Sequence, residues 1–201
     1  ASDLNLYYDV RHPLWYKRPD WFAVVGVSAF YDNQDLRLSY VMWQEGVRPI
    51  VAIELLSPGT EDEDLGKTTS KVGEPPTKWQ VYEQNLGIPY YFVFSRYTNE
   101  LQAFQLIGGH YEEMASTQGH WPIQEVGLSL GIWQGSFKDS NRYWLRWFTL
   151  KGELIPEPIE EATEAKREAA KAKREANEAK RKAEQLAAKL RELGVNPDEL
   201  E

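Results

Sequence analysis

The composition of this chain changes abruptly near two prolines, Pro156 and Pro158, and this change constrains the fold more than any other feature. Before them, aromatic and β-branched residues, glycine and proline are mixed, which is typical of a packed α/β domain. After them, the sequence is almost entirely Ala, Glu, Lys and Arg, which favours a long helix. Because proline does not fit a helix interior, the two prolines mark a boundary. We therefore predict a domain over residues 1–155 and a helical segment over residues 156–201.

The helical segment carries a continuous repeat of small and apolar residues. The repeat consists of Ala162, Ala165, Ala169, Ala172, Ala176, Ala179, Ala183, Leu186, Leu190 and Leu193. Alternating spacings of three and four are typical of a coiled coil, and Gly194 and Pro197 are expected to end the helix. We expect a homodimer through this helix, with the leucine end contributing most because alanine buries little area. The alternative is a single solvated helix that acts as a spacer.

Short segments rich in Val, Ile, Tyr or Phe predict six strands in the first domain. They are residues 21–27, 37–43, 50–57, 90–95, 101–106 and 111–114. A helix is predicted over residues 75–86, where apolar residues recur at spacings of three and four before Gly87. Strand 50–57 is nearly all apolar, which indicates a central strand covered on both faces. The helix would connect this strand to a parallel neighbour at 90–95, after a loop over residues 58–74.

Composition disfavours several classes of protein. The chain has no Cys, so a disulfide framework, a thiolate metal site and a cysteine nucleophile are excluded, and a cytoplasmic location is expected. Its three His do not have the spacing of metal ligands. No apolar run approaches the roughly 18 residues of a membrane span, so no membrane association is expected. A net charge of −8 argues against broad non-specific binding of DNA, although a local basic groove remains compatible with it.

Three polar residues stand out as candidate catalytic groups. Asp20 follows a proline and precedes an apolar strand, and Glu54 lies inside another apolar strand, where an unpaired carboxylate costs several kcal/mol. Lys78 lies in the first turn of the predicted helix, where the helix dipole disfavours a cation. Taken singly, each has an ordinary explanation: a strand-entry turn for Asp20, a salt bridge to a core arginine for Glu54 and a surface position for Lys78. The acidic run at 62–64 is interpreted as part of a solvated loop.

Together, the three residues favour a metal-dependent site. Two carboxylates at the ends of adjacent strands can bind Mg²⁺ or Mn²⁺ through oxygen. A nearby lysine can orient a water molecule or stabilise charge on a phosphate. This combination is the chemistry of phosphodiester hydrolysis.

Four blocks of sequence resemble the Uma-type family of bacterial domains. They are residues 18–22 (RPDWF), 51–60 (VAIELLSPGT), 78–82 (KWQVY) and 86–94 (LGIPYYFVF), and the end of the tail, residues 190–198, is also similar. The resemblance implies an α/β, restriction-endonuclease-like fold of the PD-(D/E)xK superfamily, with a mixed sheet and flanking helices. It also implies that Asp20 and Glu54 are metal-binding carboxylates.

The sequence departs from the simple superfamily motif in two respects. That motif has a lysine two residues after its second acid, whereas Leu56 stands two residues after Glu54. The resemblance implies that the next helix supplies the lysine as Lys78, and Lys67 and Lys71 are alternatives in the preceding loop. Such folds often contribute a further acidic residue from an N-terminal helix, and no helix is predicted in that part of this chain.

Two functional hypotheses follow. The first is a metal-dependent endonuclease acting on nucleic acid, with DNA as the expected substrate, in which Gln80 and Tyr82 support the site and Lys17 and Arg18 contact phosphates. The second is a non-catalytic oligomerising module with a degenerate nuclease fold. The acidic net charge and the missing strand lysine favour the second hypothesis.

Overall fold

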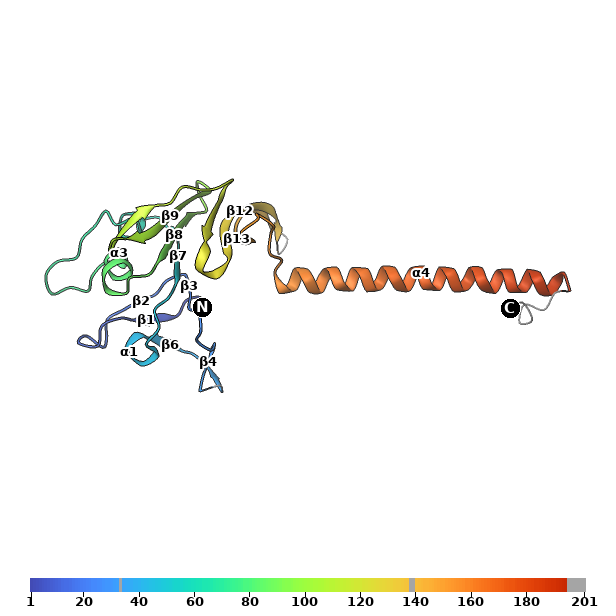
Figure 1. Ribbon diagram of the computed structural model, residues 1–201, viewed down its shortest axis with the longest axis horizontal. Helices are drawn as coiled ribbons and strands as arrows, with labels where there is room; N and C mark the ends of the chain where they lie inside the picture. The colour runs from blue at the N-terminus through green and yellow to red at the C-terminus, as the bar shows by residue number, and fades with distance from the viewer. Residues whose placement is uncertain (33, 138–139, 195–201) are drawn as a thin grey trace. The chain divides into compact units, whose positions relative to one another are not determined.

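The computed structural model describes residues 1–32, 34–137 and 140–194. Contacts between residues divide the chain into two units, 1–154 and 155–201. The first unit contains four sheets and several short helices, and the second contains one long helix (Figure 1). The fold is therefore mixed α/β with a long C-terminal helix, as the sequence indicates.

A five-stranded sheet is the centre of the first unit. In spatial order its strands are β10 (His110–Glu113), β9 (Glu100–Ile107), β8 (Tyr90–Ser95), β7 (Val51–Leu55) and β3 (Trp21–Ala23). Strands β7 and β8 are parallel, as predicted, whereas the other neighbours are antiparallel. Five predicted strands are thus confirmed, although β3 ends at Ala23 rather than at residue 27. Because β7 lies between β3 and β8 and is buried from Val51 to Glu54, its assignment as a central strand is also confirmed.

Alternating side chains give this sheet two buried faces. One face, here called the helix-side face, includes Ala52 and Tyr91 and packs against Tyr82. The opposite face, here called the hairpin-side face, includes Ile53 and packs against Leu130. On β7, residues with even numbers therefore face the helix side of the sheet, and residues with odd numbers face the hairpin side.

Three smaller sheets complete the first unit. One contains β11 (His120–Ile123), β12 (Leu128–Phe137) and β13 (Ser140–Thr149), a second contains β2 (Tyr16–Lys17), β1 (Asn5–Tyr7) and β6 (Ser39–Val41), and the third is the hairpin of β4 (Phe30–Tyr31) and β5 (Asp35–Leu36). A 3-10 turn, η2 (Gln124–Val126), separates β11 from β12. The strand predicted at 37–43 is confirmed only over β6, because the chain turns at Met42 into the short helix α1 (Met42–Glu45). The sheet of β11, β12 and β13 was not predicted.

The helix after β7 begins later than predicted. The segment predicted as a loop contains one short helix, α2 (Glu61–Asp64), before α3 (Lys78–Gln80) and a π-helical turn, η1 (Val81–Asn85). Thr77 is the N-cap of α3: its hydroxyl accepts a hydrogen bond from the Gln80 backbone N–H at 3.3 Å, and Gln80 Oε1 accepts one from the Thr77 N–H at 3.0 Å. This capping box fixes the start of the helix at Lys78.

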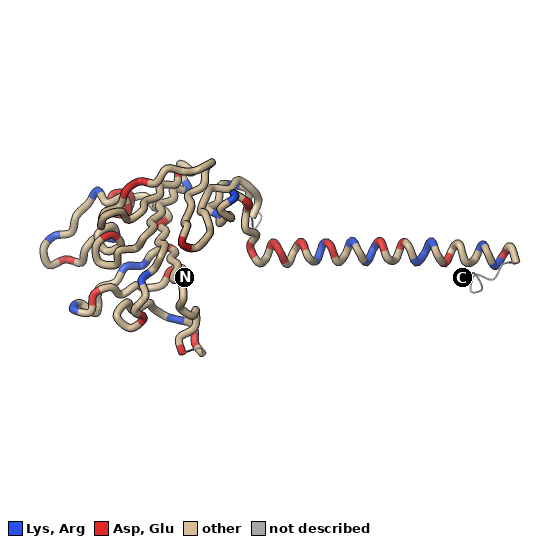
Figure 2. Tube along the Cα trace, viewed as in Figure 1, with Lys and Arg blue, Asp and Glu red and all other residues tan. Residues whose placement is uncertain are grey.

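The second unit consists of α4 (Pro158–Glu192), which spans 35 residues and has no buried residue. Glu157 is its N-cap, and Pro158 occupies the first turn, as expected for proline. Basic and acidic residues alternate along the helix (Figure 2). The prediction of a coiled coil remains untested, and Pro197 lies outside the described residues. Among the helices of the described ranges, none combines the length and the apolar character that a membrane span needs.

Candidate active site

Glu54 is a buried carboxylate at the end of β7. It has the parity of Ala52 and therefore faces the helix side of the sheet, where only 1% of its surface is exposed. A carboxylate removed from water to this extent requires charged or hydrogen-bonding partners. Two residues from the following helix supply them.

Lys78 and Tyr82 both contact the Glu54 carboxylate. The Lys78 Nζ lies 2.8 Å from Glu54 Oε2, and the Tyr82 hydroxyl donates a hydrogen bond to Glu54 Oε1 at 2.7 Å. The two residues are one helical turn apart, so their side chains leave the same side of the helix. Tyr82 is fully buried, whereas the Lys78 side chain keeps 23% of its surface exposed and so remains accessible from solvent.

Asp64 is a third acidic residue of the site, and sequence reasoning missed it. Its Oδ1 lies 3.0 Å from Lys78 Nζ, and the residue is only 1% exposed. The contact is an ion pair rather than a well-directed hydrogen bond. The Tyr91 hydroxyl donates to the Asp64 backbone carbonyl at 2.9 Å and fixes the end of α2 against the sheet. The interpretation of 62–64 as a solvated loop is therefore wrong: these residues belong to α2 and Asp64 is buried, although the Asp62 side chain is solvated, at 72% exposed.

Glu54, Asp64, Lys78 and Tyr82 are called the Glu54 cluster below. Glu63 supports this cluster from α2, because its Oε1 accepts a hydrogen bond from the Lys78 backbone N–H at 3.1 Å. Leu65, the apolar residue directly after the acidic residues 61–64, was the one sequence signal that α2 has a side facing the core.

Asp20 lies at the same end of the sheet as Glu54. The last pair between β3 and β7 is Trp21↔Ile53, so position 20 lies beside position 54. The Leu55 backbone N–H donates a hydrogen bond to Asp20 Oδ2 at 2.7 Å. The structure thus brings the first predicted acid to the strand end that carries the second.

The remaining predicted residues lie outside the Glu54 cluster. Lys67 is 3.8 Å from Asp62 and Lys71 is exposed in the loop, so neither forms a salt bridge with Glu54 in the described chain. Lys17 Nζ lies 3.4 Å from Glu63 Oε1, Arg18 pairs with Asp3, and the Gln80 side chain belongs to the capping box. Of the three candidate lysines, only Lys78 contacts the buried acid.

Burial and neighbouring charges shift the pKa values of Glu54 and Lys78. Burial raises the pKa of Glu54 to about 7, although the Lys78 ammonium and the Tyr82 hydroxyl act to lower it. Burial also acts to lower the pKa of Lys78, but Glu54 and Asp64 outweigh this effect and hold it above its ordinary value. Near neutral pH, Lys78 is therefore charged, whereas Glu54 exchanges its proton readily.

The oxygen donors of the cluster suit a hard divalent cation. Glu54 Oε2 and Asp64 Oδ1 already converge on one positive group, the Lys78 ammonium. Carboxylate oxygens are the ligands that Mg²⁺ and Mn²⁺ prefer. Within the described ranges, however, no group of three or more His, Asp or Glu residues is arranged to hold a metal ion. The donor chemistry fits such a cation, and Asp20 would need to join Glu54 and Asp64 to complete the site.

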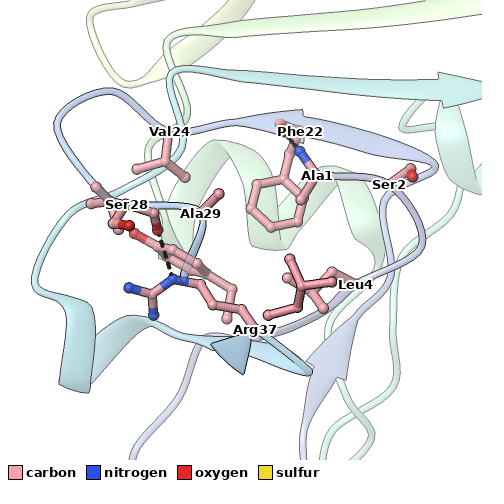
Figure 3. Close-up of a pocket in the computed structure, with 11 residues that line it drawn as sticks. Ala1, Ser2, Leu4, Phe22, Val24, Ser28, Ala29 and Arg37 are labelled. Atoms are coloured by element: carbon pink, nitrogen blue, oxygen red, sulfur yellow. Dashed lines mark hydrogen bonds between the residues drawn. The ribbon is translucent and has the colours of Figure 1, made fainter. Parts of the chain in front are cut away.

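A separate pocket of about 490 Å³ opens beside β3 (Figure 3). Its walls include Phe22 and Tyr40, whose ring centroids are 5.6 Å apart. Arg37 lines it too, but this side chain already donates to the Ser28 carbonyl at 3.0 Å and pairs with Glu45. No residue of the Glu54 cluster lines this pocket, so the two are distinct.

Comparison with known proteins supports the resemblance noted in the sequence. No curated protein is detectably similar to the chain. Residues 1–138 match the sequence profile of the Uma2 family, which is described as "Putative restriction endonuclease". The match includes Asp20 and the whole Glu54 cluster. The chain belongs to the Uma2 family, whose restriction-endonuclease-like character its mixed α/β fold accommodates.

Proposed function

We propose that this protein is a metal-dependent endonuclease that hydrolyses phosphodiester bonds of nucleic acid, with DNA as its substrate. The observation that carries the proposal is the position of the Lys78 ammonium, 2.8 Å from Glu54 and 3.0 Å from Asp64 at the end of a central strand. A lysine beside two acids at the end of a central strand suits phosphoryl chemistry, because the acids could bind a divalent cation while the ammonium stabilises charge on a phosphate oxygen. Membership of the Uma2 family supports the same class of reaction.

Each residue has a distinct role in this proposal. Asp20 and Glu54 would hold Mg²⁺ or Mn²⁺, and Asp64 would be a third oxygen donor. The bound metal would supply Lewis acidity and a water molecule of lowered pKa. Lys78, which remains protonated, donates to a phosphate oxygen or orients the attacking water. Tyr82 holds Glu54 in one rotamer through its hydrogen bond.

Cleavage of plasmid DNA tests this proposal. Wild-type protein with Mg²⁺ or Mn²⁺ should nick or linearise a supercoiled plasmid, whereas Asp20→Asn, Glu54→Gln and Lys78→Met should reduce the rate by at least about a hundredfold. Lys71→Met is the matched control, because it removes an exposed lysine of the neighbouring loop. Equal cleavage by all of the variants would refute the assignment of the site.

One observation favours the non-catalytic module as a second candidate. Lys78 pairs with both Glu54 and Asp64, and the described residues do not include a preformed group of three acids. A cluster of this kind can stabilise a fold without catalysis. Folded wild-type protein that cleaves neither DNA nor RNA with any divalent metal would favour this candidate.

We also propose that the chain forms a homodimer through α4. Leu186 on this helix and Leu193, its C-cap, are 62% and 78% exposed, and a second helix could cover them. Leu186→Glu combined with Leu190→Glu should convert dimer to monomer in light scattering of the full-length protein. Lys182→Glu is the control, because it changes charge outside the apolar repeat. A molar mass that is the same for wild type and the leucine variant would contradict the proposal.

A further inference from the structure

Strands β12 and β13 extend well beyond the sheet to which they belong. They pair from Leu128↔Thr149 to Phe137↔Ser140, whereas β11 pairs with β12 only as far as Gly131. The outer part, residues 132–137 and 140–145, is therefore a two-stranded structure, here called the β12–β13 ribbon. Such a ribbon is only marginally stable in water unless its own side chains pack together.

One face of the ribbon consists of arginines stacked on indole rings. Residues directly opposite one another share a face, so Trp133 lies opposite Trp144 and Gly135 opposite Arg142. The guanidinium carbon of Arg142 lies 4.2 Å from the Trp144 ring centroid, and that of Arg146 lies 5.1 Å from the Trp133 centroid. Both distances are those of cation–π contacts, in which each guanidinium group lies over a ring.

Gly135 makes this stacked face possible. A Cβ atom at this position would lie 2.1 Å from the Trp133 ring, so the indole can cover the backbone only because the residue is glycine. The Trp144 Nε1–H donates to the Gly135 carbonyl at 3.1 Å and fixes the second ring. The arrangement of aromatic and basic side chains is therefore built into the backbone of the ribbon.

The exposed surface of the ribbon is polar and lacks acidic side chains. Its exposed residues are Gln134, Ser136, Ser140, Asn141, Arg142 and Tyr143. Residues 128–137 and 140–149 contain two Arg and no Asp or Glu, in a chain whose net charge is −8. In the part of the chain that the structure describes, Arg142 forms no salt bridge with a carboxylate, so its N–H groups are available to an external anion.

We propose that the β12–β13 ribbon binds the phosphate backbone of duplex DNA, with Arg142 as its principal contact. A planar guanidinium matches a phosphate with two parallel hydrogen bonds, and an aromatic ring behind it reduces the entropy lost on binding. The exposed Ser140 hydroxyl, two residues from Arg142 and on the same face, is a further donor to a sugar–phosphate chain. A two-stranded ribbon also has the width of the major groove. The choice of DNA as the partner rests on the proposed function.

The ribbon would hold a segment of DNA different from the one at the Glu54 cluster. Ile132 and Leu145, at the base of the ribbon, pack against the hairpin-side face of the central sheet, whereas Tyr82 packs against the helix-side face. A remote contact of this kind raises the local concentration of substrate without taking part in the reaction. Strand β13 also lies outside residues 1–138, the part of the chain that matches the family. Arg142 is therefore outside the residues that match the family, whereas Trp133 and Gly135 on β12 lie inside them.

Fluorescence anisotropy of full-length protein tests the proposal. The probe is a fluorescein-labelled duplex of about 30 base pairs, titrated in EDTA at several salt concentrations so that neither metal nor cleavage intervenes. Arg142→Glu should weaken binding about tenfold, and Arg142→Gln should reduce the slope of log K against log salt by about one. Ser140→Glu adds a negative charge to the same face without altering the stacked rings, and it should also weaken binding. Arg174→Glu on α4 makes the same charge change as Arg142→Glu and should leave affinity within about twofold of wild type.

The outcomes separate this proposal from the proposed nuclease activity. Weaker DNA binding by Arg142→Glu and Ser140→Glu, with circular dichroism melting curves like those of wild type, supports the anchor even if no metal produces cleavage. Equal binding by wild type, Arg142→Glu and Ser140→Glu overturns the anchor, even if the plasmid is cleaved. Failure of wild-type protein to bind the duplex at low salt overturns it as well.

Discussion

Substitution of Glu54 by Gln should change how the stability of the protein depends on pH. The structure predicts this effect without any assumption about catalysis, because it follows from the burial of the carboxylate. Burial raises the pKa of Glu54 from 4.5 to about 7 in the folded protein. In the unfolded chain the group is solvated and titrates near its ordinary value. The folded state thus binds the proton more tightly, and wild-type protein loses stability as the pH rises from about 4.5 to about 7.

The size of this effect can be worked from the two pKa values. Their difference is about 2.5, and each pKa unit corresponds to about 1.4 kcal/mol, so the full effect is about 3 kcal/mol. Glutamine resembles the protonated acid in shape and does not titrate. Wild type and Glu54→Gln should therefore have similar stability near pH 5. By pH 8.5 the variant should be more stable than wild type by about 2.5 kcal/mol.

Urea unfolding followed by tryptophan fluorescence measures the two stabilities. The difference in unfolding free energy between wild type and Glu54→Gln is plotted against pH, so that contributions from all other titrating groups cancel. In wild-type protein Lys78 stays charged throughout this range, because Glu54 and Asp64 hold its pKa above its ordinary value. Parallel curves for the two proteins from pH 5 to pH 8.5 would refute the argument, because they would mean that Glu54 titrates alike in the folded and unfolded states.

Two further predictions concern the residues around Glu54. Tyr82→Phe removes the hydrogen bond to Glu54 Oε1 that lowers the pKa of this acid, and it should cost about 1–2 kcal/mol of stability. With Phe at position 82, the stability difference between the proteins with Glu and with Gln at position 54 should have its midpoint at a higher pH. An unmoved midpoint would contradict this prediction. Gly66→Ala should destabilise the protein by about 1–3 kcal/mol more than Gly73→Ala in urea unfolding. Both glycines have positive φ angles, but only at Gly66 would a Cβ meet the Trp79 ring, at 2.5 Å; equal losses would show that the ring gives way.

Local rules of sequence were sufficient to single out Glu54 and Lys78, which the structure brings into contact. Glu54 interrupts an apolar strand, and Lys78 stands where the helix dipole disfavours it, so each required a partner. The structure shows that each is the partner of the other, at 2.8 Å. A charged residue at a locally unfavourable position is informative, because another part of the fold must supply the partner that stabilises it.

Asp64 gave no comparable signal, because it stands among three other acids in a polar segment. Its burial depends on a contact remote in sequence, the hydrogen bond of the Tyr91 hydroxyl to its carbonyl. The strands after residue 114 were missed for a different reason. Gly131 and Gly135 interrupt the alternation of β12 and weaken its strand pattern. Their function appears only in three dimensions, where the rings of His120 and Trp133 occupy the space that a Cβ would need.

Burial makes the charge of Glu54 sensitive to pH. It raises the pKa of this acid to about 7, although the Lys78 ammonium acts to lower it. Glu54 Oε2 and Asp64 Oδ1 both lie against that ammonium. A divalent cation bound by Glu54 would have to displace the proton from this acid. Metal and proton therefore compete for one oxygen pair, so a nuclease built on this cluster should bind its metal more weakly as the pH falls below about 7, with Lys78 still charged and available to the phosphate.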